Sequence, residues 1–332
     1  MNILVADIGG TKTCLSLIRI KDSTQEHQSI KKEYYVSNQY QRFDLLLKTF
    51  LNDQPIEAAC LAVAGPVTQN RQVQTSEITN LPWKLNTRHI SQQFNIPNVA
   101  LVNDFAATAY GIDALKKTEL IDIQANTHKP ASQKAIIGAG TGLGQAFMIW
   151  NNNAYNAYST EGGHVDFAPT DQQQRELLEF LTHSTTPISY EHLLSGNGIV
   201  RIYSFLHQLA MPRQNPYPRL DSADEISQIA LADASSLAGQ AMKLFVRIYG
   251  AQAGNLALNT LPYDGIYIAG GIAAKNSPFF TDGNFLDAFL NKPKMQQILK
   301  SIPVKLIMNQ EVGLLGAIKQ AKLLSSGSKK NG

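Results

Sequence analysis

Two segments of the chain share one pattern: a run of strand-forming residues, a turn rich in glycine and threonine, and a second such run. The first segment covers residues 3–18 and the second covers residues 134–149. Glycine lets the backbone of such a turn approach a ligand closely, and threonine adds hydroxyl groups beside it. Because the pattern returns after about 130 residues, we interpret it as an internal duplication whose two turns meet at one ligand.

The first turn follows Asp7 and contains Gly9, Gly10 and Thr11. A carboxylate at the end of a buried strand is costly unless it faces a cation or a polar ligand. Taken alone, the segment is equally consistent with an ordinary β-hairpin and a solvated aspartate. The second copy makes a phosphate-binding turn the better interpretation.

The second turn contains alternating glycines, at positions 138, 140, 142 and 144, with Thr141 between two of them. This spacing differs from the G-x-G-x-x-G sequence of a dinucleotide-binding fold. A Walker A loop is also excluded, because no Gly-Lys pair occurs in the sequence. The pattern therefore predicts a nucleotide site built from two hairpin turns.

Size and composition favour an ordinary globular protein with two domains. The chain has 332 residues, of which 44% are hydrophobic and 17% charged, enough for two substantial cores. The net charge of +3 is small and its basic residues are scattered, so we expect no nucleic-acid partner. The two cysteines lie in apolar runs, and no apolar run approaches the roughly 18 residues of a membrane helix. We expect a cytoplasmic protein with no membrane partner.

The order of predicted strands and helices divides the chain into two α/β domains. We place the smaller domain at residues 1–112, with a returning helix at about 312–325, and the larger one at 113–311. Long helical stretches are expected at 171–209 and 224–261, separated by a Pro-rich loop at 211–218. Residues 326–332 are small and polar and are expected to form a disordered tail.

Asn103 and Asp104 follow a predicted strand and precede a predicted helix. In open α/β sheets, ligands bind at the carboxyl ends of the strands. Asp104 could instead be the N-cap of the helix, which is the commonest role for an aspartate at that position. A cap does not explain the adjacent Asn103, whose amide can donate to and accept from a hydroxyl group.

Further polar candidates lie in the larger domain. Glu161 and His164 flank a Gly-Gly pair, and such a cluster suits a ligand with many hydroxyl groups. A metal site there lacks a third ligand at recognisable spacing. Glu191 lies at a predicted helix start, where an exposed acid is also common. Gly270 and Gly271 end a strand, either as a tight turn or as a backbone edge close to adenine or ribose.

Eight motifs occur in the order typical of one family, over nearly the whole chain. They are Asp7-Ile-Gly-Gly-Thr11, Ala64-Gly-Pro66, Asn103-Asp-Phe105, Gly138-Ala-Gly-Thr-Gly-Leu-Gly144, Glu161-Gly-Gly-His-Val-Asp-Phe-Ala-Pro169, Leu194-Ser-Gly196, Ala269-Gly-Gly-Ile272 and Gly313-Leu-Leu-Gly316. In these motifs the chain resembles the bacterial glucokinase family. The resemblance implies a two-domain actin-like ATPase (ribonuclease H-like) fold, with a cleft between a small and a larger α/β domain. The chain lacks the cysteine-rich zinc loop of the related repressor and sugar-kinase branch, and Lys292 begins an unusual version of a late segment.

The resemblance also implies a reaction, in which glucose and ATP give glucose 6-phosphate and ADP, with Mg²⁺ as cofactor and a homodimer as assembly. It implies that Asp104 is the general base and that Asp7 holds Mg²⁺ through water. The implied sugar-binding residues are Asn103, Asp104, Glu161, His164 and Glu191. The implied nucleotide-binding residues are Ala6, Asp7, Ile8, Gly9, Gly10, Thr11, Gly138, Gly140, Thr141, Gly142, Gly270 and Gly271. Alternatives are a kinase of N-acetylglucosamine, mannose or fructose, and a non-catalytic sugar sensor or ATP-driven switch.

Overall fold

The structure is a computed structural model that describes residues 1–21, 27–51, 54–127, 129–183, 186–210 and 218–328. Contacts within the chain divide it into two compact units. Unit 1 comprises residues 1–115 and 311–332, and unit 2 comprises residues 116–310. The sequence predicted division points near residues 112 and 312. The predicted Pro-rich loop at 211–218 lies almost wholly outside the described residues.

Unit 1 is built on a five-stranded sheet with the order β3-β2-β1-β4-β8. The strand bounds are Asn2–Ile8 (β1), Lys12–Ile20 (β2), His27–Val36 (β3), Ala58–Val63 (β4) and Asn98–Asn103 (β8). The β1–β2 and β2–β3 pairs are antiparallel, whereas β4 runs parallel to both β1 and β8. Strand β4 is buried along its whole length, as its continuous apolar sequence predicts for a strand covered on both faces.

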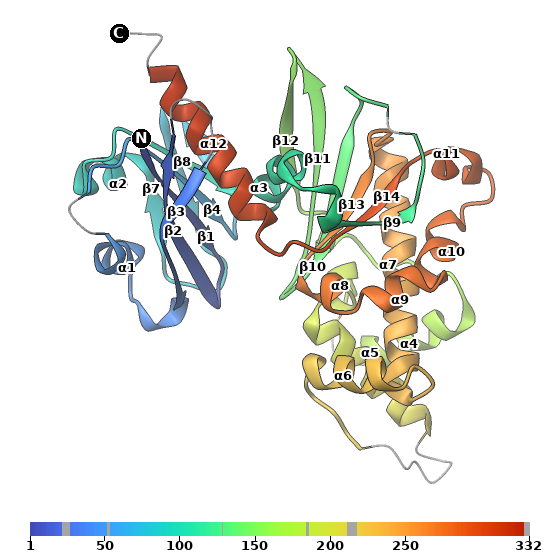
Figure 1. Cartoon of the computed structure of the whole chain (residues 1–332). Coiled ribbons are helices and arrows are strands. Elements are labelled where there is room, and N and C mark those ends of the chain that lie inside the picture. Colours follow the sequence, from blue (N-terminus) through green and yellow to red (C-terminus); the bar gives the residue numbers. More distant parts are fainter. Residues whose placement is uncertain (22–26, 52–53, 128, 184–185, 211–217, 329–332) are drawn as a thin grey trace. The chain divides into compact units, whose positions relative to one another are not determined.

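Helices cover both faces of this sheet. On one face, α12 (Val312–Ser328) packs its Leu314, Ala317 and Ile318 side chains against β1 and β4, and Figure 1 shows α12 lying across these strands. Helix α3 (Asp104–Gly111) packs against α12. On the other face, α1 (Phe43–Phe50), α2 (Thr87–Phe94) and Trp83 enclose the second core of unit 1.

Two features of unit 1 differ from the sequence prediction. A three-stranded antiparallel sheet is formed by β5 (Val67–Asn70), β6 (Val73–Glu77) and β7 (Lys84–Asn86). These strands are short and mostly polar, so they lack the long apolar run that reveals a core strand. The expected disordered tail from residue 326 is also wrong at its start, because α12 continues to Ser328.

Unit 2 contains a six-stranded sheet with the order β12-β11-β10-β13-β14-β9. The strand bounds are Leu120–Gln124 (β9), Lys134–Ala139 (β10), Leu143–Asn151 (β11), Ala154–Thr160 (β12), Ile266–Ala269 (β13) and Val304–Ile307 (β14). The β10–β11 and β11–β12 pairs are antiparallel, and β13 runs parallel to β10 and β14. The first five strands therefore repeat the order and directions of the unit 1 sheet, which supports the predicted duplication.

Helices pack on this sheet around a single large core. Their bounds are Gln172–Thr182 (α4), Gly196–Ala210 (α5), Ala223–Ala232 (α6), Leu237–Thr260 (α7), Gly271–Lys275 (α8), Ser277–Thr281 (α9), Asn284–Leu290 (α10) and Gln296–Lys300 (α11). Figure 1 shows α7 as the longest helix of this unit. The two long helical stretches predicted from the sequence are each divided into two helices. The second division falls where Ser236 caps α7 and accepts a hydrogen bond from the Gly239 N–H at 3.1 Å.

Short 3-10 helices occupy several connections, at Ser37–Gln39 (η1), Ile112–Ala114 (η2), Lys117–Glu119 (η3), Gly162–His164 (η4) and Tyr190–His192 (η5). In unit 2, η4 lies between β12 and α4, and η5 lies between α4 and α5. No helix among the described residues is long and apolar enough to span a bilayer.

Candidate functional site

The first glycine- and threonine-containing turn connects β1 to β2 and is fixed by the strand that follows. The Gly9 N–H donates to the Lys12 carbonyl at 3.1 Å, which closes the turn. Ser37 anchors it from outside, because its hydroxyl donates to the Gly9 carbonyl at 2.8 Å and its N–H donates to the Thr11 carbonyl at 3.0 Å. Gly9, Gly10 and Thr11 remain accessible to solvent. The turn is therefore a preformed surface of backbone and hydroxyl groups.

Asp7 lies beside this turn, near the end of β1. No hydrogen bond or ion pair joins its carboxylate to another described residue, and desolvation by the surrounding protein raises its pKa. The residue is nevertheless accessible to solvent, so a hydrated cation can reach it. An accessible carboxylate without a protein partner is suited to binding such a cation.

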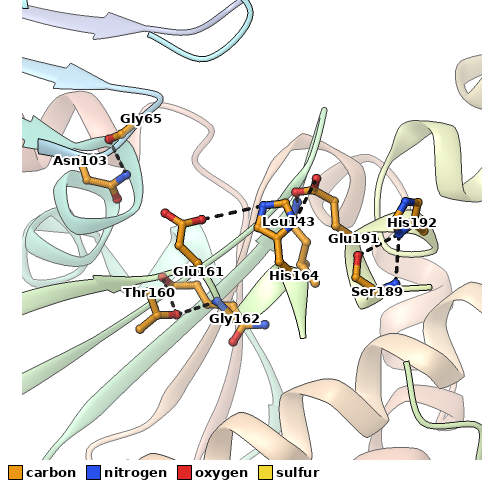
Figure 2. Close-up of polar contacts among 11 residues, drawn as sticks. Gly65, Asn103, Leu143, Thr160, Glu161, Gly162, His164, Ser189, Glu191 and His192 are labelled. Atoms are coloured by element: carbon orange, nitrogen blue, oxygen red, sulfur yellow. Dashed lines mark hydrogen bonds and ion pairs between the residues drawn. The ribbon is translucent and has the colours of Figure 1, made fainter. Parts of the chain in front are cut away.

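Asn103, rather than Asp104, caps helix α3. The Asn103 Oδ1 atom accepts from the Phe105 N–H at 3.0 Å and from the Ala106 N–H at 3.2 Å. Its amide nitrogen donates to the Gly65 carbonyl at 3.3 Å, as Figure 2 shows. Most of the hydrogen-bonding capacity of Asn103 is thus used within unit 1. The alternative role of Asp104 as the cap is therefore wrong.

Asp104 is the first residue of α3. Its Oδ1 atom accepts a hydrogen bond from the Phe105 N–H at 2.9 Å, and the N-terminal end of the helix favours a negative charge there. The Thr108 hydroxyl donates to its backbone carbonyl at 2.8 Å. The helix start thus fixes the backbone from which the carboxylate projects.

The second turn, which connects β10 to β11, borders a cavity of about 470 Å³ within unit 2. Gly140 and Thr141 lie on its wall, and Gly271 at the start of α8 lies on another part of it. The Gly140 N–H is bonded to the Gly142 carbonyl at 2.8 Å. The N–H groups of Thr141 and Gly142 donate to no other described residue, so they are available to an anionic ligand.

Three of the predicted nucleotide-binding residues lie in the interior of the sheets. Ala6 and Ile8 are fully buried in a core of unit 1, and Gly138 is buried in β10 between Gly144 and Ala269. Each sequence motif covers part of a strand as well as the turn beside it. The motifs therefore include residues that form the strand rather than the surface open to a ligand. Gly270 is accessible but does not line the cavity.

The sequence did not indicate several residues that line the cavity, namely Asn197, Asp221, Asp224, Lys275 and Asn276. Asn276 is almost completely buried and its Oδ1 atom has no hydrogen-bond partner among the described residues. Such an orphaned acceptor is costly unless a ligand or water donates to it. The Gly270-Gly271 pair at the end of a strand could have indicated these cavity-lining residues. The helix that follows this pair carries Lys275 and leads to Asn276.

The acidic and imidazole groups predicted in unit 2 form one cluster. The segments after β12 and around η5 run side by side, because the Phe167 N–H donates to the Ile188 carbonyl at 2.8 Å and the Tyr190 N–H to the Val165 carbonyl at 3.0 Å. His164 consequently lies between two carboxylates, as Figure 2 shows. Its Nε2 atom is 3.9 Å from Oε2 of Glu161, and its Nδ1 atom is 4.0 Å from Oε1 of Glu191.

The members of this cluster differ in their contacts. The Glu161 and His164 side chains are largely exposed and are available to a polar ligand. Glu191 is less exposed, and its Oε2 atom accepts a hydrogen bond from the Leu143 N–H at 2.9 Å. Among the described residues, no group of three or more His, Cys, Asp or Glu side chains is arranged to hold a metal ion. The cluster is joined to the second turn through Glu191, and its role in binding hydroxyl groups stays a prediction.

Comparison with known proteins shows the family to which the chain belongs. The model of the Glucokinase family matches residues 4–323. A glucokinase from a Nostoc species is 42% identical, over 95% of this chain and 97% of the relative. The chain belongs to the glucokinase family. A glucokinase from Synechocystis is 39% identical, over 96% of this chain and 97% of the relative.

A solved glucokinase structure from an Antarctic psychrotroph has the same fold, with a TM-score of 0.81 and 28% identity over 97% of this chain and 99% of the other. The two-domain actin-like ATPase fold predicted from the sequence is confirmed by this match. Membership of the glucokinase family was also predicted correctly from the eight ordered motifs. The roles of the individual site residues stay predictions.

Proposed function

We propose that the chain transfers the γ-phosphoryl group of ATP to the 6-hydroxyl group of glucose. Membership of the glucokinase family supports this reaction. The described residues supply the groups that such a reaction needs: two turns with accessible backbone and hydroxyl groups, a cavity beside one of them, and polar side chains suited to sugar hydroxyls. Phosphoryl transfer depends mainly on alignment and on neutralising charge, which is what these groups can provide.

Glu161, His164 and Glu191 are assigned to the sugar hydroxyls, together with Asn103 and Asp104. Carboxylates accept from hydroxyl groups, and imidazole can either donate or accept. Asn103 contributes less than the sequence suggested, because its Oδ1 atom already accepts two backbone hydrogen bonds. Its amide group retains one further N–H for the sugar.

Asp104 is assigned as the general base. The observation that carries this assignment is the place of Asp104 as the first residue of α3, where the helix start fixes its backbone and Asn103 already supplies the N-cap. In the reaction, Asp104 accepts the proton of the 6-hydroxyl group. The bond between that oxygen and the γ-phosphorus forms, the bond from the γ-phosphorus to the β,γ-bridging oxygen breaks, and ADP leaves. A correctly placed base contributes about 10² to 10⁴ in rate.

ATP is assigned to the cavity and to the two turns. The N–H groups of Thr141 and Gly142 are suited to phosphate oxygens. The unpartnered Oδ1 atom of Asn276 matches the exocyclic amino group of adenine, which is a hydrogen-bond donor. Asp7 fits Mg²⁺, since that ion is usually held by one or two carboxylates, water and substrate phosphates. When bound, Mg²⁺ neutralises negative charge on the transferring phosphoryl group.

The test is an assay of ADP formation with glucose, N-acetylglucosamine, mannose and fructose, on the wild type and on Asp104→Asn. We expect glucose to be the best acceptor. We expect Asp104→Asn to lower kcat by about 10² to 10⁴ while glucose binding, measured by calorimetry, is retained. Asp113→Asn is the matched control, because its carboxylate forms an ion pair with Lys319 (2.9 Å) and is assigned no role in the reaction, so this variant should leave kcat unchanged.

Two results would overturn the proposal. A wild type that phosphorylates none of the four sugars would exclude the kinase activity and favour a sugar sensor. A kcat for Asp104→Asn within about threefold of the wild type would exclude Asp104 as the base. Preferential use of another sugar would replace glucose while keeping the reaction.

A homodimer and a cytoplasmic location also belong to this proposal, as does Mg²⁺ as the metal. Family membership supports each of them.

A further inference from the structure

We propose that Glu191 couples sugar binding to nucleotide binding, because one carboxylate group serves both the sugar-binding cluster and the second phosphate turn. This inference rests on the proposed function, and it names the element of unit 2 through which one ligand influences the affinity for the other. Glu191 acts here as a positioning residue for the turn, in addition to its assigned contact with the sugar.

The two oxygens of the Glu191 carboxylate contact different groups. Oε2 accepts from the Leu143 N–H at 2.9 Å, directly after the turn, while Oε1 faces Nδ1 of His164 at 4.0 Å. The two oxygens belong to one planar group, so they cannot reorient independently. A sugar hydroxyl that turns this carboxylate therefore changes its bond to the turn.

No free space separates the Glu191 carboxylate from the turn. A Cβ atom on Gly142 would lie 2.4 Å from Oε2 of Glu191, well inside van der Waals contact. The same residue carries one of the two N–H groups available to phosphate. Movement of the turn toward or away from a phosphate is thus transmitted directly to the carboxylate.

Contacts of its neighbours anchor η5 and prevent the backbone of Glu191 from absorbing that movement. Tyr190 is buried against Phe167, and its hydroxyl accepts from Nδ2 of Asn255 at 3.2 Å. Lys292 donates in turn to Oδ1 of Asn255 at 2.6 Å. This chain of contacts explains a lysine in the segment that the sequence marked as unusual.

A second contact holds the other end of the turn. The Ser195 hydroxyl donates to the Glu191 carbonyl at 2.9 Å. The next residue, Gly196, donates its N–H to the Gly140 carbonyl at 2.9 Å. Residues 191–196 therefore hold the turn at both ends, and the turn and the sugar-binding carboxylate form one mechanical element. Coupling of two equilibria through one such element is reciprocal.

The experiment uses Gly142→Ala, with Gly140→Ala as its matched control in the same turn. The added methyl group at position 142 displaces the Glu191 carboxylate, whereas at position 140 it has no other atom within 4 Å. Glucose binding is measured by calorimetry without nucleotide. We expect Gly142→Ala to weaken glucose binding about tenfold, the size of one lost hydrogen bond to a charged group, and Gly140→Ala to leave it unchanged.

A second measurement tests the reciprocal direction. Glu191→Asp keeps the charge but is too short to reach the Leu143 N–H, so we expect it to weaken binding of a non-hydrolysable Mg-ATP analogue severalfold without any sugar present. The proposal assigns no nucleotide contact to Glu191, so a residue that served only the sugar would not change this value. The melting temperature and circular dichroism of each variant show whether it is folded.

Several outcomes would overturn the inference. They are unchanged glucose affinity in a folded Gly142→Ala variant, equal losses in both glycine variants, and unchanged analogue affinity in Glu191→Asp. If Gly142→Ala does not fold, Glu191→Asp alone decides the question. A wild type that binds neither glucose nor the analogue would instead refute the proposed function.

Discussion

Helices α3 and α12 of unit 1 approach each other so closely that a single methyl group should separate them. A Cβ atom on Gly316 would lie 1.8 Å from the Ala107 carbonyl oxygen, and one on Gly111 would lie 2.0 Å from the Val312 carbonyl oxygen. Both neighbouring atoms belong to backbone and cannot rotate away. Gly316→Ala must therefore open the helix pair by at least about 1.2 Å to bring the 1.8 Å contact to the 3.0 Å that real Cβ atoms keep.

The expected loss of stability follows from two opposing effects. Overpacking a rigid contact costs about 1–3 kcal/mol, and a backbone obstacle places this case at the upper end. Replacing glycine by alanine inside a helix returns about 1 kcal/mol. The net destabilisation is about 2 kcal/mol, which corresponds to a fall of about 4–8 °C in melting temperature. Because α3 begins with Asp104, we also expect kcat to fall in this variant.

Urea unfolding followed by tryptophan fluorescence suits this measurement when it is made in a Trp150→Phe background, because the remaining Trp83 is buried in a core of unit 1 and reports that unit. Gly313→Ala is the matched control on the same helix, since its nearest neighbour is the rotatable Thr108 hydroxyl at 3.3 Å. Its stability should be unchanged or slightly raised. Equal stability of Gly316→Ala and the wild type, or an equal loss in Gly313→Ala, would refute the close approach as the cause.

Two further predictions concern buried and surface hydrogen bonds. Tyr249→Phe should destabilise unit 2 by about 1–3 kcal/mol in urea unfolding, because the buried hydroxyl accepts from the Ala139 N–H and donates to the Ile137 carbonyl, both at 3.2 Å. The control Tyr158→Phe, at an exposed residue, should change the free energy of unfolding by less than about 0.5 kcal/mol. Equal effects of the two substitutions would contradict the role of the buried hydroxyl. Desolvation would raise the pKa of Asp44, but hydrogen bonds from Arg42 and Gln93 hold this pKa below its ordinary value. The ionised Asp44 therefore stabilises the folded state above about pH 4. This stabilisation is lost as the pH falls through the folded-state pKa. Arg42→Met should therefore cost about 0.5 kcal/mol at pH 7 and less near pH 3, whereas a cost independent of pH would exclude this ion pair as the cause.

Local sequence patterns predicted the long core strands better than the short strands. The strand expected before the first turn is present as β1 (Asn2–Ile8), because a mainly apolar run there ends at a glycine pair. Strands β5 to β7 and β9 were missed, since three to five residues of mixed polarity carry too weak a period. The predicted helical stretches were too long because periodicity continues across a cap such as Ser236.

Adjacent Asn103 and Asp104 show the limit of sequence reasoning at the site. Both residue types are favoured N-caps, so the sequence alone could not assign the role to one of them. The backbone decides it: Asn103 has the extended angles φ −58° and ψ 145° that precede a helix, and Asp104 is the first helical residue. The structure therefore assigns the cap to the Asn103 side chain, and the role of Asp104 as the general base stays a prediction.

The duplication makes the two turns similar in sequence, but their supports differ in a way that no turn motif records. In unit 1 the turn is held by Ser37, which follows the next strand in the same sheet. In unit 2 it is held by Glu191 in η5 and by Gly196 at the start of α5, which lie about 50 residues further along the chain. A contact across that distance depends on how the helices pack, so neither composition nor spacing could predict it. The second turn, unlike the first, is thereby joined to the predicted sugar-binding residues within its own unit.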